Sequence, residues 1–151
     1  MPEPTFRQAT AADARAIASV GAELWEELGD KSGLPGRMTA EAVAERLASY
    51  GQRGGMFVCE ADGSVCGFAI LAPDADDPEE AVMGVWLLPE ARRRGIGREL
   101  ALMATDFARA AGFQRLKGTL PPGNEPALSF FSDIGSLAQM VGQGMEYELP
   151  L

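Results

Sequence analysis

Apolar residues recur along the chain at two different spacings, which predict where its helices and strands form. After Gly95, apolar side chains return every three or four residues, which predicts a helix with one buried face. The residues on that face are Ile96, Leu100, Met103 or Ala104, Phe107 and Ala111. Gly112 stands where many helices end in a left-handed glycine. The apolar run 82–88 just before this helix predicts a strand buried on both faces.

Helical spacing also predicts two helices in the first third of the chain. A short strand is expected at Thr5–Arg7, and Thr10 to Asp13 has the pattern of a capping box that opens a helix. Apolar residues then follow at helical spacing, at Ile17, Val20, Leu24 and Leu28. After a loop over residues 29–36, Thr39 is a suitable N-cap for a second helix that runs to about Tyr50. Its inward residues are Val43 and Leu47.

Two apolar runs separated by Asp62-Gly63 predict a β-hairpin, with strands at 56–61 and 64–71. A two-residue turn would place Cys59 directly opposite Cys66. That spacing suits a disulfide, but two small buried thiols are the favoured interpretation for a protein in a reducing compartment. The chain contains no histidine, which excludes the usual serine and cysteine triads and most zinc sites.

The C-terminal part continues as a strand at 115–120 and a turn with a short helix at 124–131. A final hairpin is expected from strands 138–141 and 145–149. The acidic stretch 73–80, just before the apolar strand, is either a solvated hairpin loop, which is favoured, or a surface that attracts a cationic substrate.

Length and composition indicate a globular protein with one domain, residues 1–151. Apolar residues make up 46% and charged residues 23% of the chain, which is ordinary for a folded domain. No apolar run approaches the length of a membrane span, and the N-terminus lacks the pattern of a signal peptide, so a cytoplasmic location is expected and no membrane partner. The net charge of −9 argues against nucleic acid as a partner.

Against this acidic background, four arginines cluster between the apolar strand and the helix that follows it. They are Arg92, Arg93, Arg94 and Arg98, interleaved with Gly95 and Gly97. The first N–H groups of a helix have no partner within the helix, and the helix dipole favours an anion in front of them. Glycines let a ligand approach the backbone closely. The stretch therefore predicts an anion-binding loop.

Two familiar phosphate-binding motifs do not fit this loop. A dinucleotide fingerprint needs a third glycine where Leu100 stands, and a P-loop needs a Lys-Ser or Lys-Thr pair after its glycines. What matches is R-x-x-G-x-G, formed by Arg92, Gly95 and Gly97, with an apolar strand and Pro89 before it and a helix after it. This pattern resembles the pyrophosphate loop of the GNAT N-acetyltransferase superfamily, and the order of predicted elements agrees from about residue 5 to residue 149.

The resemblance implies a GNAT fold of the α/β (α+β) class: a mixed, mostly antiparallel sheet of about six or seven strands with about four helices. It also implies acetyl-CoA, or coenzyme A, as co-substrate and no metal. In that family the loop binds the pyrophosphate and the preceding strand pairs with the pantetheine arm. Carried over to this chain, the cofactor-binding residues are Trp86, Leu87, Leu88, Arg92, Arg93, Arg94, Gly95, Ile96, Gly97, Arg98, Asn124 and Phe131. On this reading Gly97→Trp should abolish CoA binding and leave the fold intact.

The catalytic groups are less complete than in the family. Phe131 occupies the position where the family often has a tyrosine that protonates the leaving thiolate. The family's carboxylate base falls at Ala81, so Glu80 is a candidate base one residue away, although a one-residue shift changes the face of a strand. An amine with a pKa of about 10 must lose a proton before it attacks. The backbone N–H of Leu87 or Leu88 is the expected donor to the oxyanion.

The expected reaction is transfer of an acetyl group from acetyl-CoA to a primary amine of a small molecule or peptide. Trp25, Glu26 and Glu27 would lie on the acceptor side, although a core tryptophan and two solvated acids are the favoured interpretation. Two alternatives stay open: a non-catalytic GNAT-fold module that senses acyl-CoA, and an interaction protein whose arginine loop binds an acidic partner. A homodimer is a further open possibility.

Overall fold

The computed structural model describes residues 3–29, 34, 38–92, 94–120, 137–141 and 144–150. For Leu28 and for the strands beyond Lys117 it describes the backbone only.

One mixed sheet organises the molecule. Its strands are β1 (Thr5–Gln8), β2 (Gly55–Ala61), β3 (Ser64–Pro73), β4 (Glu80–Leu87), β5 (Arg115–Leu120), β6 (Leu137–Val141) and β7 (Gly144–Pro150). They lie in the order β1-β2-β3-β4-β5-β7-β6. The β4–β5 pair is parallel and the other pairings of the described strands are antiparallel. This confirms the predicted fold class.

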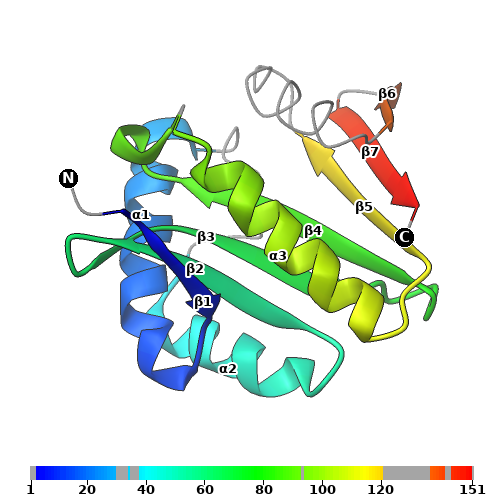
Figure 1. Ribbon diagram of the computed structural model, residues 1–151, viewed down its shortest axis with the longest axis horizontal. Helices are drawn as coiled ribbons and strands as arrows, with labels where there is room; N and C mark the ends of the chain where they lie inside the picture. The colour runs from blue at the N-terminus through cyan, green and yellow to red at the C-terminus, as the bar shows by residue number, and fades with distance from the viewer. Residues whose placement is uncertain are drawn as a thin grey trace.

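Helices cover both faces of the sheet (Figure 1). On one face lie α1 (Ala14–Leu28) and α2 (Ala40–Tyr50), and on the other lies α3 (Ile96–Ala110). Each helix begins and ends close to its sequence signals: Thr39 Oγ1 accepts a hydrogen bond from the N–H of Ala42 at 3.1 Å, and Gly112 has a φ of 93°. The fourth predicted helix, at 124–131, lies outside the described residues.

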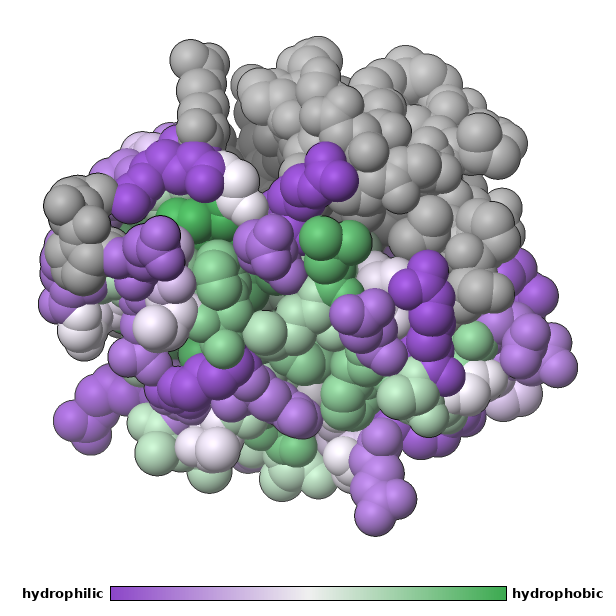
Figure 2. All heavy atoms as spheres, in the orientation of Figure 1, coloured by the Kyte–Doolittle hydropathy of each residue, from purple (hydrophilic) through white to green (hydrophobic). Residues whose placement is uncertain are grey.

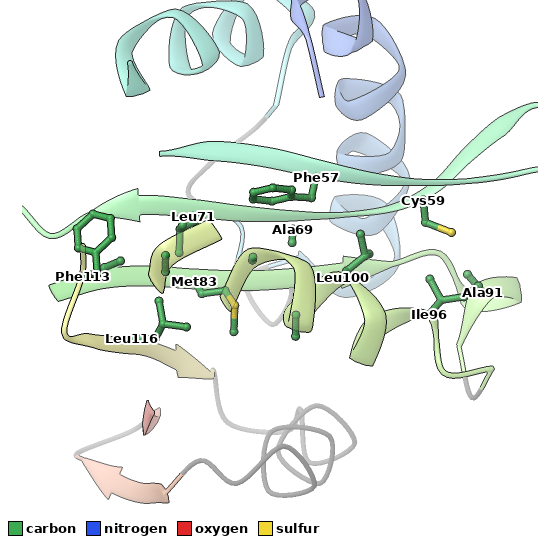
Figure 3. Close-up of a cluster of buried hydrophobic side chains, with 14 of the residues drawn as sticks. Phe57, Cys59, Ala69, Leu71, Met83, Ala91, Ile96, Leu100, Phe113 and Leu116 are labelled. Atoms are coloured by element: carbon green, nitrogen blue, oxygen red, sulfur yellow. The ribbon is translucent and has the colours of Figure 1, made fainter. Parts of the chain in front are cut away.

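The face under α3 carries one of the two hydrophobic clusters of the described residues (Figure 3). Ile96, Leu100 and Ala104 on α3 are buried there, which confirms the predicted inward face. Met83 and Leu116 pack into the same cluster from β4 and β5. Figure 2 views the molecule from this side, and polar side chains surround a more apolar middle.

The prediction that β4 is buried on both faces is wrong for one of them. Ala81 and Met83 point to α3 and are fully buried, but Val82 on the opposite face is 37% exposed. Trp86, on the same face as Val82, packs against the cluster below α1 and α2, so these helices cover the C-terminal part of the strand and leave Val82 open.

The hairpin is confirmed, but the pairing of its cysteines is wrong. Asp62 and Gly63 both have positive φ, as the predicted turn requires. A register shift after Cys59 places that residue opposite Gly67, so Cys66 becomes the extra residue of a β-bulge. The bulge still brings the two Sγ atoms to 3.3 Å, as free and buried thiols. Burial, with the hydrogen bond from Cys66, raises the pKa of Cys59 to about 12.

The parallel pair β4–β5 positions the predicted site. α3 connects these two strands, so its N-terminus lies at the carboxyl end of β4, where ligands commonly bind in α/β sheets. In the described part of the chain the β4–β5 ladder joins Glu80 to Arg115, Ala81 to Leu116 and Val82 to Lys117, and goes no further. Beyond it the two strands diverge toward their carboxyl ends (Figure 1).

Candidate cofactor-binding site

The loop between β4 and α3 ends in a helix start that has no side-chain cap. Gly95 is the N-cap residue, with a φ of 79°, a conformation that L side chains rarely adopt. The first helical hydrogen bond runs from the N–H of Glu99 to the carbonyl of Gly95 at 3.2 Å. The N–H groups of Ile96, Gly97 and Arg98 precede it and therefore have no partner within the helix. An anion in front of them would receive these donors and the positive end of the dipole.

Gly97 has a packing role that the sequence did not indicate. It is buried, and a Cβ added there would lie 3.2 Å from Cδ1 of Leu87 and 3.8 Å from Cγ1 of Val85. The glycine thus lets the first turn of α3 lie directly on β4. This corrects the expectation that Gly97→Trp would block a ligand and leave the fold intact, because an indole at this position would push the helix away from the strand.

The predicted arginines differ in their surroundings. Arg94 and Arg98 are exposed and form no ion pair with any described residue. Arg92 is engaged: its Nη1 and Nη2 donate to the two carboxylate oxygens of Glu27 at 2.9 and 2.7 Å. Its Nε donates to the carbonyl of Leu87 at 3.2 Å. Arg93 lies outside the described residues.

The backbone of β4 offers a second set of donors beside the loop. The N–H of Leu88 donates to the carbonyl of Cys66 at 3.0 Å, and the carbonyl of Glu80 accepts from the N–H of Asp74 at 2.9 Å. Residues with even numbers in β4 therefore direct their backbone groups to β3, and alternation directs those of Val85 and Leu87 to the side of β5. In the described part of the chain, the ladder with β5 ends before these two amides.

This geometry corrects the backbone donors expected from the sequence. The N–H of Leu88 is bonded to β3 and is not available to an oxyanion. Trp86 also directs its backbone to β3, by the same alternation. Of the three predicted strand residues, Leu87 is the one whose N–H faces β5. Val85, whose N–H also faces β5, was not among the residues predicted from the sequence. Alternation along the apolar run would have identified it once one hydrogen-bonded residue pair between β4 and β3 was known.

Glu80 and Leu88, the two groups named for catalysis, lie at opposite ends of β4. A strand rises about 3.3 Å per residue, so they are about 26 Å apart and cannot act on the same thioester. The Glu80 side chain is 14% exposed, and one of its carboxylate oxygens is 3.8 Å from Nζ of Lys117. Glu80 is therefore not placed to act as the base for a thioester held at the other end of β4.

The acidic stretch 73–80 is tied to the beginning of β5. Asp77 pairs with Arg115 at 2.7 Å, and Asp74 pairs with Lys117 at 3.2 Å. The N–H of Gln114 also donates to the carbonyl of Glu79 at 2.7 Å. These contacts fasten β4 and β5 together where both strands begin, which is the end opposite to their divergence. The stretch is thus neither a purely solvated loop nor a free acidic surface.

The remaining site predictions are only partly covered by the structure. Asn124 and Phe131 lie outside the described residues. Trp25 is half-buried and Glu26 is exposed, whereas Glu27 has the ion-pair partner described above. Among the described residues, no group of three or more Cys, Asp or Glu side chains is placed to hold a metal ion. No helix in the same part of the chain has the length and apolar character needed to cross a membrane.

Comparison with known proteins decides the family. The profile of the "Acetyltransferase (GNAT) family" matches residues 21–135. The chain belongs to the GNAT acetyltransferase family. It is 31% identical over 121 residues to an aminoglycoside N(6')-acetyltransferase type 1 of Stenotrophomonas maltophilia, which covers 75% of this chain and 72% of the relative.

Solved structures show the same GNAT fold. A ribosomal-protein-alanine N-acetyltransferase from Brucella melitensis superposes with a TM-score of 0.85 at 21% identity, covering 97% of this chain and 99% of the other. YncA of Salmonella typhimurium, described as a putative acetyltransferase with its cofactor acetyl-CoA, also has a TM-score of 0.85, at 18% identity. That match covers 99% of this chain and 95% of the other. At these identities, the two matches establish the GNAT fold and not a substrate.

Proposed function

We propose that this GNAT protein is an N-acetyltransferase that moves the acetyl group of acetyl-CoA to a primary amine. The proposal is supported mainly by two sets of backbone N–H groups that lie at the same end of β4. One set belongs to the uncapped first turn of α3, and the other to the edge of β4 that faces β5, at Val85 and Leu87. The first set suits a diphosphate and the second suits the amide-containing pantetheine arm. YncA, with the same fold, is described with bound acetyl-CoA.

The chemistry of such a site depends on positioning and on backbone donors. The amine nitrogen attacks the thioester carbonyl, a tetrahedral oxyanion forms, and the thiolate of CoA leaves with a proton taken from the amine. The N–H of Val85 or Leu87 would stabilise the oxyanion, and one such donor is worth about 3 kcal/mol. Thiol catalysis by Cys59 is disfavoured because burial holds its pKa at about 12.

The acceptor is proposed to be a small, cationic primary amine. The relative from Stenotrophomonas maltophilia is named for acetylation of an aminoglycoside, a class of small polycationic amine. A net charge of −9 would favour the approach of such a molecule. The single-domain organisation and the cytoplasmic location stay predictions, the first supported by a sheet whose strands come from residues 5–8 through 144–150.

Two acetyl donors that differ only beyond the pantetheine-like arm would test this proposal. Acetyl-CoA carries the diphosphate, whereas S-acetylpantetheine keeps the whole pantetheine arm and ends before the diphosphate. Thiol release with a panel of small amines should be detected with both donors, and Arg94→Ala should raise the KM for acetyl-CoA by about three- to tenfold while leaving the truncated donor unaffected. Arg109→Ala is the matched control, since this exposed arginine is near the far end of α3 and pairs with Asp106. Failure of CoA to bind would overturn the proposal.

A non-catalytic acyl-CoA sensor is the second candidate. It is favoured by Phe131 in place of the usual tyrosine and by the absence of a carboxylate near Val85 in β4, where Glu80 is about 16 Å away along the strand. A sensor would bind acetyl-CoA in calorimetry without releasing thiol in the presence of any amine of the panel. That outcome would replace the catalytic proposal with this one.

A further inference from the structure

One guanidinium group joins three segments around the proposed diphosphate loop. Arg92 directly follows the short helix η3 (Pro89–Ala91) and stands four residues before α3. Two of its nitrogens bind both carboxylate oxygens of Glu27, on the last turn of α1. Its third nitrogen, Nε, donates to the carbonyl of Leu87 at the end of β4. The parallel, two-point geometry with Glu27 fixes the plane of the guanidinium as well as its position.

The contact to Leu87 lies on the edge of β4 that faces β5. Leu87 directs its backbone groups away from β3, as established above, so its carbonyl needs a partner from elsewhere. Arg92 supplies that partner and bends the loop back over the end of the strand. The side chains of Arg92 and Glu27 are 37% and 34% exposed, so the pair is neither deeply buried nor fully solvated.

Glu27 also determines how much positive charge the loop offers. Its carboxylate neutralises Arg92, and the Arg92 guanidinium in turn lowers the pKa of Glu27, so the pair carries no net charge at neutral pH. Among the described residues of the loop, Arg94 and Arg98 then remain as cations without an ion-pair partner. Arg92 therefore contributes chiefly by shaping the loop.

We infer that Glu27 is a positioning residue for the cofactor loop, which it holds against β4 by fixing Arg92 on the carbonyl of Leu87. This inference rests on the proposed function, since it names a residue that prepares the diphosphate site. It also links the end of α1, where the chain leads toward α2, to the loop before α3. Loss of the carboxylate would free Arg92 and loosen the loop without removing any group that touches the acetyl donor.

The test compares Glu27→Gln with Glu23→Gln. Glu23 lies one turn earlier on the same helix, is exposed and has no described ion-pair partner, so its substitution changes the charge by the same amount. Glu27→Gln should weaken CoA binding in calorimetry and raise the KM for acetyl-CoA by about fivefold, and Glu23→Gln should change neither. Neither variant should alter turnover of S-acetylpantetheine, which has no diphosphate to bind.

A second variant tests the same contact from the Arg92 side, so that the result does not depend on how well Glu27→Gln folds. Arg92→Lys keeps the charge but loses the two-point contact, so it should also raise the KM for acetyl-CoA. The KM of the double variant Arg92→Lys with Glu27→Gln should not exceed that of the single variant with the higher KM, because both substitutions break the same contact. Unchanged or tighter CoA binding by Glu27→Gln would overturn the inference, because tighter binding means that Glu27 competes with the diphosphate for Arg92. Equal losses with both acetyl donors would also overturn it. If the unmodified protein does not bind CoA, the proposed function fails instead.

Discussion

Two glycines of the loop motif are required for different physical reasons. Gly95 adopts a left-handed φ of 79°, and nothing lies within 4 Å of where a Cβ would be. Glycine is therefore needed at this position for its backbone conformation and not for space. Gly97 has an ordinary backbone, but its missing side chain leaves space for Leu87. The spacing of the motif predicted that both positions matter. It could not predict the packing role of Gly97, because that role depends on a side chain from the preceding strand.

A buried carboxylate holds the beginning of α1 to β1. Asp13 is 11% exposed and accepts hydrogen bonds from Nη1 and Nη2 of Arg7 at 2.8 and 2.7 Å. The N–H of Thr10 donates to the same carboxylate at 2.8 Å, as the predicted capping pattern requires. The hydrogen bonds from Arg7 lower the pKa of Asp13 to about 2, against an ordinary value of 3.8.

Asp13 should make the free energy of unfolding depend on pH in the acid range. Because its pKa is lower in the folded state, its contribution of about 2 kcal/mol is present above pH 4 and is lost as the pH falls toward 2. Asp13→Asn should therefore reduce the slope with which the free energy of unfolding, measured in urea, falls between pH 4 and pH 2. Asp76→Asn, which removes an exposed carboxylate without a described ion-pair partner, is the matched control for the loss of one negative charge. Identical slopes for Asp13→Asn and the unmodified protein would contradict this assignment.

Within β4, a glycine and a tryptophan two residues apart share one face. The Trp86 indole lies over Gly84, and a Cβ added to the glycine would come within 2.3 Å of Cη2 of the ring. The same ring stacks on Phe68 of β3, with centroids 5.3 Å apart and an interplanar angle of 28°. β4 thus shares an aromatic pair with β3 on one face and has the donors of Val85 and Leu87 along its edge.

Gly84→Ala should force the indole off Phe68 and destabilise the protein by about 1–3 kcal/mol. The cost should largely disappear when the same substitution is made in a Trp86→Leu background, because the ring that meets the new methyl group is gone. Urea unfolding of the four proteins gives the coupling energy. Additive effects of the two substitutions would show that the ring does not lie on Gly84.

Helices and strands were predictable where the apolar spacing is strong, as for α3 and for the hairpin around Asp62-Gly63. The bulge at Cys66 was not predictable, since a two-residue turn alone implies that Cys59 faces Cys66. The exposure of Val82 was not predictable either. An apolar run shows which residues prefer burial, but not how far the helices on each face of the sheet extend.

At the scale of the whole molecule, the site depends on one parallel strand pair that is fastened at one end. Ion pairs from Asp74 and Asp77 hold the start of β5 beside β4, and within the described strands their ladder stops after three residue pairs. The motif and the order of elements predicted this architecture. The pair between Glu27 and Arg92 could not be predicted, because the two residues are 65 positions apart and each looks like an ordinary surface charge in the sequence.

The edge of β4 that faces β5 is the surface proposed to bind acetyl-CoA. Amide hydrogen exchange, measured by NMR with and without saturating CoA, tests it residue by residue. CoA should slow the exchange of the Val85 and Leu87 amides and of the first-turn amides of α3, and should change that of the Leu88 amide little, because Leu88 is already bonded to β3. Unchanged exchange at Val85 and Leu87 with CoA bound would show that CoA does not bind along this edge of β4.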